Sequence, residues 1–433
     1  MKVLMFGWEF PPHISGGLGT ACYGLTKGLT ELKNIDVIFV VPKAFGDEDQ
    51  TGMQLIGANS VALNQREVQF DDVQKKIDYL EVDSQIVPYV SEDEFWKLKS
   101  GKYSKETKFV QTGEGYKIDF SGSYGPDLFQ EIKNYAFISE IIAQKNTFDI
   151  IHAHDWLAYP AGMAAKRASG KPLIIHVHAT EFDRSGGNVN PGVYAIEREG
   201  MEMADKIIAV SNLTRNIIIE KYHISPEKIT TVYNAVEPVG KTRRPIIKKG
   251  VNEKVVTFLG RITMQKGPEY FIEAANLILK KMNNVRFVMA GSGDMMDRMI
   301  NHVAELGITD KFHFTGFLQG DDVFQMFEMT DVFVMPSISE PFGIVPLEAM
   351  QSGVPVIISN QSGVAEILEN AMKIDFWDTH AMADSIYGLL NYPSLAEHFK
   401  MEGKQEVNNL KWISSAENVK EVYESALNSV TQI

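Results

Sequence analysis

Two separate series of short apolar segments, each segment followed by a helical pattern, constrain this chain of 433 residues more than any other feature. Short runs rich in Val, Ile and Phe are typical of buried parallel strands. The first series comprises VLMFG at 3–7, VIFVV at 37–41, DIIHAH at 149–154, PLIIHVH at 172–178 and KIIAVS at 206–211. The second comprises VVTFLG at 255–260, VRFVMAG at 285–291, FHFTG at 312–316, VFVMPS at 332–337 and VPVIIS at 354–359. This alternation predicts an α/β architecture with two open, mostly parallel sheets.

The stretch between the two series marks a domain boundary. It is rich in Lys, Arg, Pro and Gly and shows no amphipathic period. We therefore predict an N-terminal domain at 1–237, a linker at 238–250 and a C-terminal domain at 251–410.

Two further segments stand outside the strand and helix alternation. Residues 45–125 are acidic and punctuated by glycine, and we interpret them as an insertion on the first domain. The last segment, 411–433, contains an amphipathic helical pattern at about 414–430.

Composition excludes several classes of protein. The formal charge of −14 has the wrong sign for a general binder of nucleic acid or of anionic membranes. The single cysteine, Cys22, cannot form an internal disulfide and suits a reducing compartment. Neither a signal peptide nor a membrane-spanning apolar run is evident, so we expect a cytoplasmic protein.

Open parallel sheets bind ligands at the carboxyl ends of their strands, which directs attention to the residues there. After the first strand, the glycine-rich turn SGGLGT at 15–20 leads into a helix. Such a turn can bring backbone N–H groups close to an anion. It can equally be a tight structural turn, and it matches neither the dinucleotide fingerprint nor the P-loop.

The loop after the strand at 255–260 carries two cations. Arg261 and Lys266 could bind a diphosphate and stabilise the charge that develops on it as a leaving group. The alternative is a pair of solvated surface cations.

The segment SEPFGIVPLEAM at 339–350 is the strongest local feature. Pro and Gly make a helix-start turn, so the amides of Gly343, Ile344 and Val345 could form an anion site. Glu340 precedes the predicted helix, and Glu348 lies within it, about two turns from its start. Ionised carboxylates suit sugar hydroxyls because they accept several hydrogen bonds. Glu348 could instead be a solvent-facing helix carboxylate.

Histidines occur as two alternating pairs, His152 with His154 and His176 with His178, each pair at the end of an apolar strand. Both members of a pair face one side of the sheet. The spacing allows three interpretations: metal ligands, substrate contact by His154 and His178, or packed core histidines. The acidic triplet at 47–49 is interpreted as a solvated loop.

These motifs resemble those of a known family. GWEFPPHISGGLGT, HAHDW, HVHATEFDRSGG, VYNAVE, LGRITMQKG, GSGD, FTGFL and SEPFGIVPLEAM occur in the order found in retaining GT-B glycosyltransferases of family four. The opening WEFPP segment, HAHDW and the insertion resemble most the glycogen and starch synthase branch. The resemblance implies two Rossmann-like doubly wound domains facing across a deep cleft, with the C-terminal helix crossing back to the first domain.

The resemblance also implies roles on the donor side. Arg261 and Lys266 would bind the diphosphate, assisted by the Gly17 amide. Glu348 would hold the ribose hydroxyls, and Glu340 would contact the donor sugar and steady positive charge at its anomeric carbon. His178 would contact the sugar near the bond that breaks, whereas His154 and Asp155 would line the acceptor side.

The implied activity is that of a hexosyltransferase. It would move glucose from UDP- or ADP-glucose to an α-1,4-glucan with retention of configuration, with no bound metal and no cofactor besides the nucleotide sugar substrate. Ser15 stands where ADP-glucose synthases carry Lys, and Glu348 stands where many bacterial members carry Tyr. The donor base therefore stays open.

Other functions remain as alternatives. The same reaction could act on a capsular, cell-surface or lipid-linked glycan or on a small sugar phosphate. A metal-dependent hydrolase built on the histidine pairs and a non-catalytic carbohydrate-binding protein belong to different classes.

Overall fold

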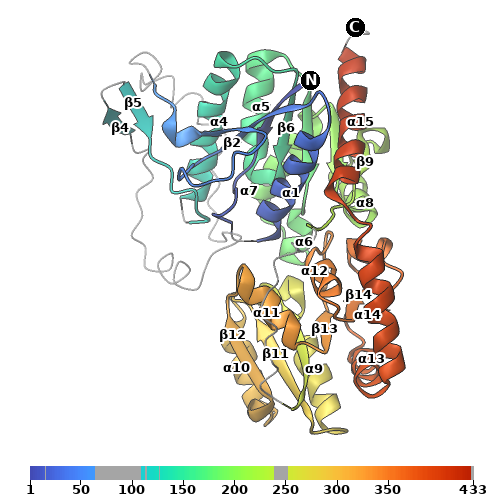
Figure 1. Cartoon of the computed structure of the whole chain (residues 1–433). Coiled ribbons are helices and arrows are strands. Elements are labelled where there is room, and N and C mark those ends of the chain that lie inside the picture. Colours follow the sequence, from blue (N-terminus) through green and yellow to red (C-terminus); the bar gives the residue numbers. More distant parts are fainter. Residues whose placement is uncertain (15, 64–108, 113–114, 126, 238–251, 431–433) are drawn as a thin grey trace. The chain divides into compact units, whose positions relative to one another are not determined.

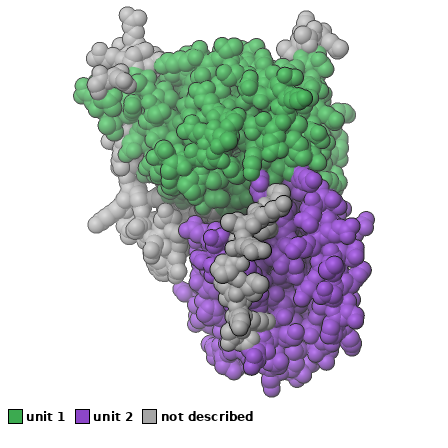
Figure 2. Space-filling view, in the orientation of Figure 1, with its two compact units in different colours: residues 1–234, 412–433 green, residues 235–411 purple. Residues whose placement is uncertain are grey.

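The computed structural model describes residues 1–430 except 15, 64–108, 113–114, 126 and 238–251. The chain forms two compact units, which are coloured separately in Figure 2. Unit 1 comprises Met1–Asn234 and Trp412–Ile433, and unit 2 comprises Ala235–Lys411. The expected linker at 238–250 lies outside the described residues.

Unit 1 contains a seven-stranded parallel sheet in the order β3-β2-β1-β6-β7-β8-β9 (Figure 1). Its strands are β1 (Lys2–Phe6), β2 (Asp36–Val41), β3 (Gln54–Gly57), β6 (Ile150–His154), β7 (Leu173–Val177), β8 (Lys206–Ala209) and β9 (Ile229–Thr231). Its helices are α1 (Gly17–Glu31), α4 (Leu128–Lys145), α5 (Asp155–Ser169), α6 (Glu181–Ser185), α7 (Pro191–Met203), α8 (Asn212–Tyr222) and α15 (Trp412–Val430). A separate antiparallel hairpin pairs β4 (Phe109–Thr112) with β5 (Gly115–Ile118).

Unit 2 contains a six-stranded parallel sheet in the order β12-β11-β10-β13-β14-β15. Its strands are β10 (Lys254–Leu259), β11 (Val285–Ala290), β12 (Phe312–Gly316), β13 (Val332–Met335), β14 (Val356–Ser359) and β15 (Met372–Ile374). Its helices are α9 (Pro268–Leu279), α10 (Met296–Glu305), α11 (Asp321–Met329), α12 (Val345–Gln351), α13 (Thr379–Asn391) and α14 (Pro393–Val407). In each sheet, strands are added on one side of the first strand and then on its other side, as in doubly wound folds. The prediction of two doubly wound α/β domains is therefore confirmed.

The expected insertion at 45–125 was wrong at its beginning. Residues Gln54–Gly57 form β3, which pairs in parallel with β2 at the edge of the main sheet. The acidic triplet at 47–49 is also ordered by contacts rather than only solvated. Glu48 is buried, and its carboxylate accepts hydrogen bonds from the amides of Phe45 at 2.6 Å and Gly46 at 2.9 Å.

The sheet of unit 1 is covered on both faces, and β6 shows how. Ile151 and Ala153 face α5, because a Cβ placed on Gly162 of that helix would meet both side chains. The intervening residue His152 faces α15, where its Nδ1 atom is 2.6 Å from the Tyr423 hydroxyl. Alternate residues of β6 therefore lie in opposite layers. In the described part of the chain, no helix combines the length and apolar character needed to span a membrane.

Helices α1 and α15 pack through a glycine contact. A Cβ on Gly24 would lie 2.2 Å from Cε2 of Trp412, whose side chain is buried. The indole occupies the space that a larger residue at position 24 would need.

We predict that Gly24→Ala destabilises the fold, because the added methyl group would force Trp412 out of its position. Overpacking of this kind costs about 1–3 kcal/mol. Urea unfolding of the purified variant measures this change. Gly388→Ala in α13 is the matched control, since its Cβ would meet only Leu395 at an ordinary 3.7 Å. An equal loss of stability in both variants would contradict the packing argument.

Candidate functional site

The carboxyl edge of the unit 1 sheet brings two predicted histidines together. His154 ends β6, and His178 directly follows β7. The Nδ1 atom of His154 lies 3.0 Å from Nε2 of His178, within hydrogen-bond distance. Burial lowers the pKa of His178, so its ring is neutral at physiological pH. A neutral imidazole can accept or donate a hydrogen bond at a sugar hydroxyl.

One buried guanidinium supports both histidine positions. Arg184 donates from Nη2 to Oδ1 of Asp155 at 3.0 Å and to the carbonyl oxygen of Ala179 at 3.1 Å. Asp155 follows His154 and has a left-handed backbone with φ of 61°, whereas Ala179 follows His178. The arginine thereby fixes the two residues next to the histidine pair.

The other side of Arg184 contacts further carboxylates. Its Nη1 atom donates to Oε1 of Glu197 at 2.8 Å and lies 3.7 Å from Oε2 of Glu181. Burial raises the pKa of Asp155, Glu181 and Glu197, while the positive charge of Arg184 opposes this rise. Tyr222 also donates to Glu197. Arg184 lies in the motif HVHATEFDRSGG, but no feature of the sequence marked it as a site residue.

The structure changes what His154 and Asp155 can do. Both side chains are buried, at 0% and 1% exposure, and Asp155 is bound by Arg184. Neither offers an accessible surface to an acceptor in this structure. Their positions suit them to hold the more exposed His178 in place.

The glycine-rich turn lies beside these residues in the sheet order, since β1 pairs with β6. Gly17 is the first residue of α1 and is exposed, and a Cβ at this position would meet nothing within 4 Å among the described residues. The open space fits the predicted approach of an anion.

In unit 2, the two predicted motifs contact each other. Lys266, at the end of a short 3₁₀ turn (Met264–Lys266), donates to Oε2 of Glu340 in an ion pair. Glu340 is only 8% exposed and accepts a second hydrogen bond from the Ser337 hydroxyl at 3.2 Å. A cation and a carboxylate therefore meet at the carboxyl edge of this sheet.

Gln265 joins the same two loops, a role that the sequence did not predict. Its Oε1 atom accepts from Nη2 of Arg261 at 3.2 Å, and its Nε2 atom donates to the carbonyl oxygen of Ser339 at 3.0 Å. The side chain is buried and so holds Arg261 next to the segment at 339–350.

The helix that carries Glu348 begins later than expected. Helix α12 starts at Val345, so Glu348 lies in its first turn and not two turns from the start. Gly343 has φ of 104°, a conformation that favours glycine, and Ile344 precedes the helix as its N-cap. Burial raises the pKa of Glu348 to about 7. The three predicted amides and this carboxyl group lie within one short segment.

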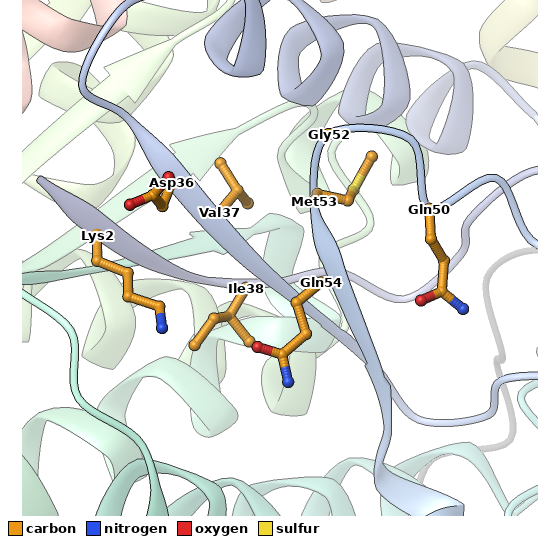
Figure 3. Close-up of a pocket in the computed structure, with 8 residues that line it drawn as sticks. All are labelled: Lys2, Asp36, Val37, Ile38, Gln50, Gly52, Met53 and Gln54. Carbon is orange, nitrogen blue, oxygen red and sulfur yellow. The ribbon is translucent and has the colours of Figure 1, made fainter.

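An open pocket elsewhere on unit 1 is not part of this site. Figure 3 shows it at the amino ends of β1 and β2. The histidines lie at the other ends of the strands, since His154 ends β6 and His178 follows β7. Its lining residues are Lys2, Asp36, Val37, Ile38, Gln50, Gly52, Met53 and Gln54.

Comparison with known proteins identifies the class. Residues 241–406 match the family of glycosyl transferases group 1, and residues 116–239 match Glycosyltransferase Family 4. Together with the two parallel-sheet α/β units, these matches identify the chain as a group 1 glycosyltransferase with the GT-B fold.

Individual relatives are distant. An uncharacterized glycosyltransferase of Methanocaldococcus jannaschii is 27% identical over 99% of each chain. The glycogen synthase of Mycobacterium tuberculosis is 24% identical over 98% of this chain and 95% of its own length. The solved structure of Anabaena HepE in complex with UDP and glucose aligns with a TM-score of 0.67 at 16% identity, covering 98% of this chain and 100% of that one. At 16% identity, the similarity to HepE shows a shared fold and nothing more.

We predict that Arg184→Met lowers the free energy of unfolding by about 3–5 kcal/mol, because it leaves Asp155 and Glu197 as buried carboxylates without their cation. Chemical denaturation measures the loss. Arg198→Met is the matched control, since the Arg198–Glu202 pair is exposed and should contribute less than about 1 kcal/mol. Similar losses in both variants would show that the network around Arg184 contributes little.

Glu348 should make the stability of the ligand-free protein depend on pH. Its pKa rises from 4.5 in the unfolded chain to about 7 in the folded protein, so the folded state binds the proton more tightly. This stabilisation is complete below about pH 4.5 and is lost as the pH rises through about 7. We expect wild type to lose up to about 3 kcal/mol relative to Glu348→Gln between about pH 5 and pH 8. The exposed Glu397→Gln on α14 is the control, and parallel curves for wild type and Glu348→Gln would refute the shift.

Proposed function

We propose that this protein is a retaining hexosyltransferase that moves glucose from UDP- or ADP-glucose to an α-1,4-glucan in the cytoplasm. The observation that carries the proposal is the contact between Lys266 and Glu340 at the carboxyl edge of unit 2. A cation for a phosphate and a carboxylate for a sugar are needed at adjacent points of one nucleotide sugar.

When the donor binds, the ion pair between Lys266 and Glu340 would break, and each of the two side chains would bind a group of the donor instead. Arg261 and Lys266 would take the diphosphate, and the amides of Gly343, Ile344 and Val345 would add partial positive charge. Gln265 would keep Arg261 in place through the hydrogen bond that it already accepts. Glu340, released from Lys266, would then accept hydrogen bonds from the sugar and stabilise positive charge at the anomeric carbon.

Glu348 would bind the ribose hydroxyls in its ionised form. A pKa of about 7 in the ligand-free protein means that part of this group is protonated near neutral pH. Two ribose hydroxyls donating to the carboxylate would favour ionisation. Donor affinity would accordingly weaken as the pH falls below about 7.

In the transfer step, the bond between the anomeric carbon and the diphosphate oxygen breaks, and the acceptor hydroxyl forms the new bond on the same face. The departing diphosphate takes the acceptor's proton, so neither a metal nor a separate base is required. Arg261 and Lys266 would stabilise the negative charge on the leaving group. The Gly17 amide and the His178 ring would contribute from unit 1, with His154 and Asp155 positioning His178.

The second candidate keeps the reaction and changes the acceptor. A small sugar phosphate or another glycan is compatible with the same donor residues, since these belong to unit 2, whereas the acceptor side predicted from the sequence belongs to unit 1. Because His154 and Asp155 are buried, the two side chains predicted to line the acceptor side do not select an α-glucan over another acceptor.

The proposal is tested by nucleotide diphosphate release from UDP-, ADP- and GDP-sugars, with and without glycogen, in the presence of EDTA. Release from one glucose donor that depends on glycogen would support it. Donor hydrolysis without stimulation by glycogen would favour the second candidate. If no donor released nucleotide diphosphate, the substrate assignment would be overturned.

We predict that Arg261→Ala and Lys266→Ala each reduce turnover by about 10²–10³, because each removes a preorganised donor to the leaving group. Steady-state kinetics with the preferred donor measure the effect. Lys281→Ala is the control, since Lys281 forms an exposed ion pair with Asp384. Turnover within a few-fold of wild type in the first two variants would refute the diphosphate role.

A further inference from the structure

A cluster of three buried histidines lies between the unit 1 sheet and helix α15. His152 and His154 come from β6, and His176 comes from β7, where it is the register partner of His154. Their exposed fractions are 0%, 0% and 1%. Each ring has a nitrogen within 4.8 Å of a nitrogen on each of the others.

Several nitrogen atoms of these rings form no hydrogen bond with the described residues. His152 uses Nδ1 for the Tyr423 hydroxyl, and His154 uses Nδ1 for His178. The Nε2 atoms of both rings and both ring nitrogens of His176 have no hydrogen-bond partner among the described residues. Buried polar atoms without partners are costly, and such a group of them needs a physical explanation.

The pattern corresponds to that of metal-ligating histidines. A histidine ligand binds the ion with one ring nitrogen while a neighbouring polar group orients the other. Tyr423 and His178 occupy that orienting position for His152 and His154. Burial lowers the pKa of all three rings, which keeps them in the neutral form that metal ions bind.

The dimensions allow an ion to be held. Zinc–nitrogen bonds of about 2.0–2.1 Å in a tetrahedral site place ligand nitrogens about 3.3 Å apart. The ring nitrogens that lie within 4.8 Å of one another would therefore have to approach each other by no more than about 1.5 Å to bind one ion. Three neutral imidazoles favour zinc and similar divalent transition metals over magnesium or calcium, which prefer oxygen ligands.

We propose that His152, His154 and His176 form a structural site for a divalent transition metal ion of the zinc class. The site lies under α15 and supplies no reacting group to the chemistry proposed above, although His154 also contacts His178. Its metal content can therefore be tested whether or not the protein transfers sugar. Bound metal would fix the rings of β6 and β7, and through His152 and Tyr423 it would strengthen the attachment of α15.

A second group of possible ligands overlaps with this one. Cys22, His154 and His178 also bring their ligand atoms within 4.8 Å of one another. In that group, however, His154 and His178 already share a hydrogen bond. The unused nitrogens of His152 and His176 favour the three-histidine site.

The test is the metal content of protein purified without a polyhistidine tag from zinc-supplemented medium. We expect roughly one zinc ion per chain, with X-ray absorption showing nitrogen neighbours at about 2.0–2.1 Å. His176→Gln should lose the metal and lower Tm by about 5 °C or more. His302→Gln is the matched control, because His302 lies in unit 2 and is bound to Glu273.

Several outcomes would overturn the proposal. One is wild-type protein without metal that shows no change in Tm when Zn²⁺, Co²⁺ or Ni²⁺ is added, since water would then account for the buried nitrogens. Another is metal retained by His176→Gln. A sulfur neighbour at about 2.3 Å would assign the ion to Cys22 instead. The wild-type measurements decide the question even where His176→Gln fails to fold.

Discussion

Parallel pairing of every strand in the two main sheets is the constraint on which the chemistry of this protein depends. Such sheets have both faces covered, so polar side chains that meet a ligand are concentrated where strands end. His154 and His178 lie at the ends of β6 and β7, and Arg261 and Lys266 follow β10. Each unit thereby gathers polar groups from several loops at one edge. The same arrangement buries His152 and His176, which lie two residues before His154 and His178, respectively.

At both edges, a charged side chain from one loop binds a group from another. Arg184 ties the segments after β6 and β7, and Lys266 ties the segments after β10 and β13 through Glu340. The two contacts differ in burial and therefore in consequence. Arg184 is only 6% exposed and bound to several oxygens, which suits a permanent support. Lys266 is 19% exposed, and among the described residues it forms an ion pair with one carboxylate, that of Glu340, which suits a contact that a phosphate can replace.

The sequence was sufficient for ten of the strands and for the motifs, because short apolar runs and strand-end glycines are local signals. Edge strands β9 and β15 contain only three residues each and show no periodicity, and β3 begins with a polar Gln54, so these were not anticipated. Contacts between distant residues were also invisible. Lys266 and Glu340 are 74 positions apart, and His152 and Tyr423 are 271 positions apart. Gln265 and Arg184 gained their roles only from such contacts.

The histidine pairs show how one motif can serve two purposes. Alternation on a strand places His152 beside His154 and His176 beside His178 on the same face. Distance from the strand end then separates them: His178 retains partial exposure at the edge, whereas His152 reaches Tyr423 of α15 in the interior. His154 belongs to both environments, since its Nδ1 atom contacts His178 and its Nε2 atom is buried with no hydrogen-bond partner among the described residues. Any ion held by the buried rings would therefore fix the orientation of His154 and, through it, the hydrogen bond that positions His178.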